Sequence, residues 1–147
     1  MKVLIIGSGG REHAQTWALA QSPLVSKLYS VTTNAGICSL TTPVSLNAAQ
    51  PAAAAEFATR EKLDLVVVGP EQPLVDGVVD ALAARGIPAF GPTQAAARLE
   101  GSKIFSKDFM ARHELPTARY RVVETVADAF AALHDFTYPL VVKADGL

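Results

Sequence analysis

Cysteine is almost absent from this 147-residue chain, in which Cys38 is the single example. One thiol cannot form an internal disulfide, and such scarcity is typical of a protein kept in a reducing compartment. Long hydrophobic runs are absent too: no stretch approaches the length of a membrane span, and the apolar start of the chain is too short for the core of a signal peptide. These absences predict a cytoplasmic protein without a membrane partner.

An excess of charge of either sign is also missing. Thirteen lysines and arginines nearly balance fourteen acidic residues, which leaves a net charge of −1. Such a balance provides no basic surface for nucleic acid or for an anionic membrane, so we predict no nucleic-acid partner. Any bound anion must then be held locally, by backbone amides and a few placed cations. The three histidines show no metal-binding spacing, and no metal site is predicted within the chain.

Two nucleotide-binding motifs are missing or incomplete. No G-x-x-x-x-G-K-[ST] sequence occurs, which excludes a P-loop. The turn Gly7-Ser8-Gly9-Gly10 begins like the dinucleotide motif G-x-G-x-x-G, but Glu12 stands where the third glycine is required. The second predicted strand ends at Val31 and two threonines, without the acidic residue that binds ribose in NAD enzymes. A dinucleotide-dependent oxidoreductase is therefore a disfavoured alternative.

Strand-length apolar runs alternate with alanine-rich helical segments along most of the chain. This alternation predicts an α/β fold with an open, mostly parallel sheet and flanking helices. The predicted strands are Val3–Ile6, Lys27–Val31, Leu65–Val68 and Ile87–Phe90. The predicted helices are Arg11–Gln21, a segment from a capping box at Asn47 and Gln50 to about Lys62, Val75–Arg85 and Gln94–Glu100. Trp17 in the first helix is expected in the core.

The pattern changes after Gly101-Ser102, which predicts a domain boundary there. The first domain would span residues 1–101, and residues 102–147 would begin a second one. The later segment is predicted to contain helices Lys103–Arg112 and Thr125–Leu133, with Thr125 and Asp128 as a capping box, and strands Arg119–Val123 and Leu140–Lys143. A strand–helix–strand unit of this length cannot cover its own sheet.

Four loops are expected at the carboxyl edge of the sheet, where open parallel sheets bind ligands. They contain the glycine turn, Asn34-Ala35-Gly36, Gly69–Pro73 and Gly91–Thr93. The glycine turn followed by Arg11 would suit a phosphate, or it is simply a tight turn that requires glycine for its backbone angles. A carboxylate at Glu71 would hold ribose hydroxyls or an amine, or it is the first-turn acid of the next helix.

Lys143 closes the last predicted strand. Alternation places Lys143 on the same face as Val141, in a strand that reads as buried. A buried ammonium requires an anionic partner, for which a nucleotide phosphate would serve. The alternative is a lysine at the end of a strand whose side chain reaches water.

Six separated stretches resemble the glycinamide ribonucleotide synthetase family of the ATP-grasp superfamily, in the same order and along nearly the whole chain. They are KVLIIGSGGREH at 2–13, the Asn34 motif, DLVVVGPEQPLVDGVVD at 64–80, GIPAFGPTQAAARLEG at 86–101, SKIFSKDFM at 102–110 and YPLVVKADGL at 138–147. The resemblance implies a Rossmann-like domain followed by the beginning of an ATP-grasp domain.

The resemblance also implies a ligase of purine biosynthesis. Such enzymes join glycine to 5-phosphoribosylamine with ATP, through a glycyl phosphate, and Mg²⁺ or Mn²⁺ neutralises the phosphates. By resemblance, the phosphate of the substrate would meet Gly9, Gly10 and Arg11, and its ribose and amine would meet Asn34, Gly36, Pro70 and Glu71. Two lysines, Lys103 and Lys143, match those that face the ATP phosphates.

The sequence departs from the family pattern in two places. Thr32-Thr33 stands where the family has Pro-Gly, which predicts a different path for this loop. The sequence ends at Leu147, before the family's glycine-rich loop, adenine contacts and metal ligands, so no catalytic residue is expected within it. We expect the 147 residues alone to be catalytically silent and prone to self-association through uncovered apolar surface. The alternative function is a non-catalytic module that binds phosphoribosyl ligands.

Overall fold

The computed structural model describes residues 1–47 and 50–146. The chain forms two compact units, Met1–Ala97 and Arg98–Leu147. In the two described stretches, no helix combines the length and the apolar character needed to cross a membrane. The domain boundary after Gly101 stays a prediction: the two compact units divide after Ala97, within α6 (Gln94–Gly101), and α7 (Lys103–Arg112) follows.

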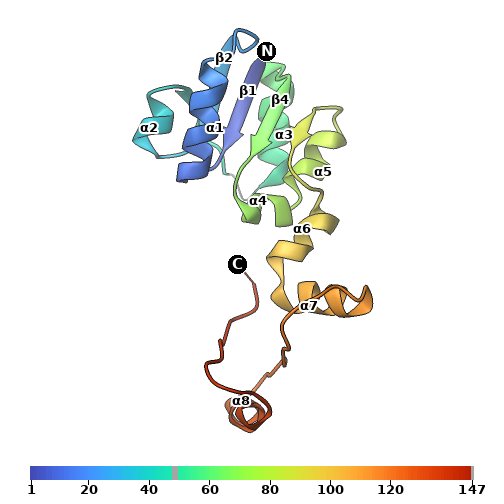
Figure 1. Ribbon diagram of the computed structural model, residues 1–147. Helices are drawn as coiled ribbons and strands as arrows, with labels where there is room; N and C mark the ends of the chain where they lie inside the picture. Colours follow the sequence, from blue (N-terminus) through green and yellow to red (C-terminus); the bar gives the residue numbers. More distant parts are fainter. Residues whose placement is uncertain (48–49, 147) are drawn as a thin grey trace. The chain divides into compact units, whose positions relative to one another are not determined.

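The first unit is built on a five-stranded parallel sheet with the strand order β3-β2-β1-β4-β5. Strands β2, β1 and β4 are labelled in Figure 1. The strands are β1 (Lys2–Ile6), β2 (Lys27–Val31), β3 (Thr42–Pro43), β4 (Leu65–Val68) and β5 (Ala89–Phe90). All four pairings are parallel, which confirms the predicted fold class. The edge strand β3 was not predicted, since a two-residue strand that contains Pro43 carries no apolar run.

Helices cover both faces of this sheet (Figure 1). Alternate side chains of β1 point to opposite faces, so Leu4 and Ile6 belong to one apolar cluster, whereas Val3 and Ile5 belong to another. The first cluster packs on α3 (Pro51–Glu61) and α5 (Val78–Ala83). The second includes Leu19 of α1 (Gly10–Ala20). A strand covered on both faces explains the continuous apolar run.

The predicted helix Val75–Arg85 corresponds to α5, which spans only Val78–Ala83. A separate short helix, α4 (Glu71–Val75), precedes it and begins within the predicted loop Gly69–Pro73. Between them, Gly77 is buried and has a φ of 92°, in the left-handed region that only glycine adopts without cost. The sequence pattern continued across this position because a glycine inside a periodic segment does not by itself reveal its backbone angle.

Two other local predictions also require correction. The N-cap of α3 is Gln50, with Pro51 as the first helical residue, rather than Asn47. Asn47 instead accepts a hydrogen bond on its carbonyl from the N–H of Gln50, at 3.0 Å. The predicted loop that contains Asn34-Ala35-Gly36 includes the start of a short helix, α2 (Ala35–Cys38).

The second unit contains helices and extended segments. After α7 come α8 (Val126–Ala132) and a 3-10 turn, η1 (Leu133–Asp135). Thr125 caps α8 as predicted, because its hydroxyl accepts from the N–H of Asp128 at 3.1 Å. Its hydroxyl also donates to the Asp128 carboxylate, at 2.7 Å.

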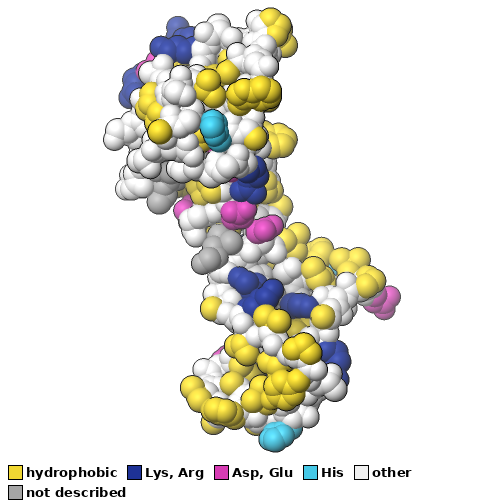
Figure 2. Space-filling view, turned by 60° about the vertical axis from the view of Figure 1, so that its left-hand side comes forward, with side chains coloured by type: hydrophobic (Ala, Val, Ile, Leu, Met, Phe, Trp, Pro, Cys, Tyr) yellow, Lys and Arg dark blue, Asp and Glu magenta, His cyan; other side chains and the backbone are white. Residues whose placement is uncertain are grey.

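The two strands predicted in this second unit are not formed. Residues 119–123 and 140–143 have no regular secondary structure. A strand requires a neighbouring strand for its backbone hydrogen bonds, and in the described part of the chain neither segment has one. Their apolar side chains consequently lie near or on the surface, with Val141 and Val142 nearly four-fifths exposed. Figure 2 shows hydrophobic side chains on the surface of the molecule.

Candidate functional site

The strand order creates a switch point between β1 and β4. The chain proceeds from β1 to β2 on one side and from β4 to β5 on the other, although β1 and β4 are hydrogen-bonded neighbours. The connections that leave their carboxyl ends therefore run to opposite sides, and open α/β sheets bind ligands at such a switch point. The glycine turn follows β1, and Gly69-Pro70 follows β4. Both are loops that the sequence singled out.

Arg11 connects these two loops. Its guanidinium donates through Nη2 to the carbonyl of Gly69 and, at 3.1 Å, to Oε1 of Glu71. Nε donates to Oε1 of Glu12 at 2.9 Å. The Arg11 side chain remains 56% exposed, so the cation is held in place and still accessible to an anion from solvent.

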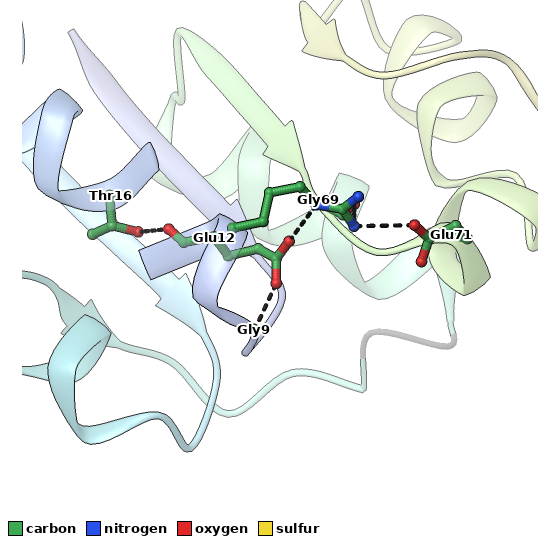
Figure 3. Close-up of polar contacts among 6 residues, drawn as sticks. Gly9, Glu12, Thr16, Gly69 and Glu71 are labelled. Atoms are coloured by element: carbon green, nitrogen blue, oxygen red, sulfur yellow. Dashed lines mark hydrogen bonds and ion pairs between the residues drawn. The ribbon is translucent and has the colours of Figure 1, made fainter. Parts of the chain in front are cut away.

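Glu12 is the residue that the sequence reasoning misjudged. Its side chain is 4% exposed, and its Oε2 accepts from the N–H of Gly9 at 2.6 Å. The Glu12 carbonyl accepts from the Thr16 hydroxyl at 2.7 Å. The Glu12 carboxylate accepts from Arg11, which in turn donates to Glu71 (Figure 3). Its position three residues after the N-cap Gly9 was the available signal, because an acid there reaches back to the helix start.

The glycines around Glu12 leave space for its side chain. A Cβ on Gly7 would lie 2.5 Å from Cγ of Glu12, and one on Gly9 would lie 2.7 Å from its Oε2. A Cβ on Gly69 would overlap the same carboxylate. Real Cβ atoms are not found at such distances, so a side chain at Gly7 or Gly69 would displace Glu12, and one at Gly9 would require the end of its carboxylate to move.

The charged forms of Arg11 and Glu71 are both stabilised at the switch point. The hydrogen bond to Glu12, and then that to Glu71, raises the pKa of Arg11 above its ordinary value. The pKa of Glu71 is lowered, first by a hydrogen bond from its own backbone N–H and then by Arg11. Glu71 is thus both the first-turn acid of α4 and a partner of Arg11, two roles that the sequence could not separate.

The predicted Asn34 loop reaches the same turn. Asn34 caps α2, since its Oδ1 accepts from the N–H of Gly36 at 2.9 Å, and its Nδ2 donates to the carbonyl of Ser8 at 2.9 Å. The hydroxyl of Thr32 accepts from the N–H of Asn34 at 3.0 Å, so the threonine at this departure from the family pattern supports the Asn34 turn. Gly36 faces the His13 ring, leaving no room for a Cβ.

The structure therefore gathers the predicted site residues of the first unit around one turn. Gly9 lies in the turn, Gly10 and Arg11 begin α1, and Pro70 is close to Gly7. The N–H of Gly9 is already engaged by Glu12. The next two amides, of Gly10 and Arg11, are the ones for which a helix start offers no internal acceptor.

A shallow hollow of about 300 Å³ lies on the face of α1 that begins at Gly10. It is lined by Gly10, His13, Ala14 and Trp17. Trp17 is 59% exposed, contrary to the expectation that it belongs to the core. Helical periodicity could not identify the covered face of α1, because its apolar residues Ala14, Trp17, Leu19 and Ala20 point in different directions around the helix.

The two lysines assigned to ATP lie in the second unit. Lys103 begins α7 and donates through Nζ to the carbonyl of Gly146, whereas Lys143 is exposed on an extended segment and not buried in a strand. Asp145 links that segment to the start of α7. Its carboxylate accepts from the N–H of Ile104 at 3.1 Å and from the Ser102 hydroxyl.

Asp145 is held as an anion at this position. The hydrogen bond from Ile104 is the largest cause of its lowered pKa, and Ser102 contributes further. Across residues 1–47 and 50–146, no three His, Cys, Asp or Glu side chains gather in a way that could hold a metal ion.

Comparison with protein families covers the whole chain. Residues 1–100 match the family described as phosphoribosylglycinamide synthetase, N domain. The chain belongs to this family. Residues 101–147 match the ATP-grasp (A) domain of the same synthetase. The resemblance carried by the six sequence stretches is thereby confirmed.

Curated relatives of the phosphoribosylglycinamide synthetase family align along the full chain. The phosphoribosylamine–glycine ligases of Salmonella typhimurium and Escherichia coli are each 51% identical over 149 aligned residues. That of Agrobacterium fabrum is 50% identical over 147. In each case the alignment includes 100% of this chain and 35% of the relative, so the chain spans about one third of their length.

Solved structures show the same fold at low sequence identity. Phosphoribosylglycinamide synthetase from Anaerococcus prevotii superposes with a TM-score of 0.65 and 19% identity, over 94% of this chain and 35% of its own. N5-carboxyaminoimidazole ribonucleotide synthetase from Thermus thermophilus gives 0.64 and 23%, over 93% and 37%. At these identities the likeness concerns the fold alone.

Proposed function

We propose that this chain supplies the phosphoribosyl-binding part of an ATP-dependent ligase that joins glycine to 5-phosphoribosylamine in purine biosynthesis. The observation that carries this proposal is the position of Arg11, whose cation is fixed across the switch point and remains open to solvent. Relatives that are half identical along the whole chain bear the name of this activity. The reaction would release ADP and phosphate through a glycyl phosphate intermediate.

Each predicted residue has a role in this proposal. The N–H groups of Gly10 and Arg11, with the Arg11 guanidinium, would bind the substrate phosphate, because a helix start and a fixed cation both favour an anion. Asn34 and Gly36 would border the ribose from α2. Glu71 would accept from the ribose hydroxyls or the amine, since an ionised carboxylate only accepts hydrogen bonds. Gly9 and Pro70 would shape the turn.

ATP would meet the second unit. The ammonium groups of Lys103 and Lys143 suit a polyphosphate, and the tie between Lys103 and Gly146 keeps the first of them next to the segment that carries the second. The described residues contain no cluster that fits Mg²⁺ or Mn²⁺. No step of the proposal is therefore assigned to a metal held by this chain, and these 147 residues are expected to lack turnover by themselves.

A titration followed by NMR tests the substrate site. The isotope-labelled chain would be titrated with glycinamide ribonucleotide, and NAD would serve as the ligand control. We expect saturable shifts of the Gly9, Gly10 and Glu71 amides with a dissociation constant in the millimolar range, or ~4 kcal/mol, and no response to NAD. We expect this weak affinity because the residues of the proposed site would contact the ligand from one side only.

The matched variants are Arg11→Ala and Arg60→Ala. Both remove an exposed arginine, but Arg60 lies on α3 and pairs with Glu61 away from the glycine turn. Loss of binding in the first variant with retention in the second supports the proposal. Equal binding by both, or no saturable shifts in the unsubstituted chain, would overturn it. If only NAD caused saturable shifts, the result would favour the alternative of a dinucleotide-dependent oxidoreductase.

A further inference from the structure

Glu12 is a buried carboxylate for which the proposed function names no role. Its side chain is closed to solvent, since only 4% of it is exposed. Its two oxygens nevertheless accept from two groups of the candidate site, the Gly9 amide at 2.6 Å and Arg11 Nε at 2.9 Å. Both partners donate, so each of the two carboxyl oxygens of Glu12 accepts one hydrogen bond.

The position of Arg11 depends on this carboxylate. A free arginine side chain has many rotamers, and fixing them costs conformational entropy. Nε is held by Glu12, and this leaves Nη2 to reach Gly69 and Glu71 across the switch point. The Glu12 backbone is fixed in turn by the Thr16 hydroxyl at its carbonyl.

The same side chain also sets the class of ligand. The dinucleotide motif requires a glycine at position 12, so that the helix can pack closely on the strand and its start can cradle a pyrophosphate. Here Glu12 occupies that volume and uses the Gly9 amide, which would otherwise be a donor. What remains for an anion is the Gly10 and Arg11 amides and one guanidinium, a set that suits a single phosphate.

We infer that Glu12 is a positioning and specificity-determining residue, which aims Arg11 at a monophosphate and closes the turn to dinucleotides. This inference rests on the proposed function for the identity of the ligand. It does not make Glu12 a catalytic residue, because the carboxylate is enclosed by protein groups and would not touch the substrate.

Glu12→Gln tests the inference with the least change in shape. A glutamine cannot accept from both Gly9 and Arg11, because one of its terminal atoms is itself a donor. In the chain without ligand, we expect the Gly9 amide and the Arg11 Nε–H signals to shift, and glycinamide ribonucleotide to bind about tenfold more weakly. Glu56→Gln is the control, since Glu56 is an exposed acid on α3.

Gly69→Ala provides a second route that leaves Glu12 in the sequence. The added methyl group would displace the Glu12 carboxylate, so this variant should reproduce the loss of affinity. A purely structural role would lower the melting temperature in both variants and leave the affinity of the folded chain unchanged, which contradicts the inference. Unchanged Gly9 and Arg11 signals in Glu12→Gln contradict it too. No binding by the unsubstituted chain would instead overturn the proposed function, and the ligand role of Glu12 with it.

Discussion

Arg11 and Glu71 form a pair whose two members come from different sides of the switch point. Arg11 begins α1 and Glu71 begins α4, sixty positions apart in sequence. An exposed ion pair of this kind adds little to folding stability. Its value lies in orientation, because a guanidinium already directed by two carboxylates and one carbonyl loses less freedom when an anion arrives.

Replacing Arg11 by alanine should raise the pKa of Glu71. Arg11 stabilises the ionised carboxylate, so its loss moves the pKa upward toward the ordinary value of 4.5, and the remaining backbone hydrogen bond keeps it below that value. A pKa lowered in the folded state means that the ionised form stabilises the fold above pH 4.5, and that this contribution disappears as the pH falls through the lowered value.

Carbon-detected NMR of the Glu71 carboxyl group, followed over an acid titration, measures this change. Arg60→Ala is again the control and should leave the Glu71 titration where it is. An identical Glu71 titration in the Arg11 variant would show that the ion pair is absent in solution.

At the scale of elements, the turn between α4 and α5 has the clearest backbone requirement. Gly77 has a φ of 92°, and a Cβ there would approach the side chain of Gln94 to 3.3 Å. Gln94 is itself anchored, because its side-chain amide donates to the carbonyl of Val75 at 2.9 Å. This turn directs α5 onto the sheet, where Val78 and Leu82 are fully buried.

Gly77→Ala should lower the free energy of unfolding by about 1–2 kcal/mol, which is the cost of left-handed backbone for a residue with a Cβ. Urea unfolding followed by circular dichroism would measure the loss. Gly77→Asn has the same Cβ and the same crowding, but asparagine tolerates this conformation better. We therefore expect a smaller loss for asparagine, and equal losses in the two variants would attribute the effect to crowding instead.

The elements that the sequence predicted correctly are those specified locally. β1 and β4 are apolar runs that end at glycine, and Thr125 is a capping residue at the right spacing. The failures needed information from distant residues. Residues 119–123 and 140–143 have the composition of strands but no partner, and Trp17 lies on a helix face whose exposure depends on packing.

The candidate site was predicted in the same uneven way. Arg11, Asn34 and Glu71 were found because they follow strands at one edge of the sheet. Glu12 was treated only as a break in the dinucleotide motif. Matching a motif shows that the required glycine is missing, but it does not show what the glutamate in its place contacts. Only the three-dimensional structure shows that this substitute is the partner of Arg11.

At the scale of the whole molecule, the two units differ in how much they bury. The first has two apolar clusters on the two faces of its sheet. In the second, Ala132 is the single buried residue among positions 98–146. Proposed ligand residues nevertheless lie in both, which means that the substrate and ATP roles cannot be tested together on the first unit alone.

A chimera tests both roles together. This chain would replace the aligned 149 residues of the Escherichia coli relative, which is 51% identical to it along that stretch. We expect glycine-dependent release of ADP, with Arg11→Ala raising the KM for the phosphoribosyl substrate by at least about tenfold. A chimera that folds and binds ATP but shows no such release would contradict the proposed ligase function, and Arg60→Ala in the same chimera is the control.

The fit between Glu12 and its three glycines constrains how this sequence can change. Adding a side chain at Gly7 or Gly69 would force the glutamate to move, and adding one at Gly9 would displace the end of its carboxylate. Shortening the glutamate first would leave an unfilled space and two unsatisfied donors. Each single step is therefore unfavourable, although the combined change need not be. The four positions form an epistatic unit, because the effect of a side chain at any of the three glycines depends on which residue stands at position 12.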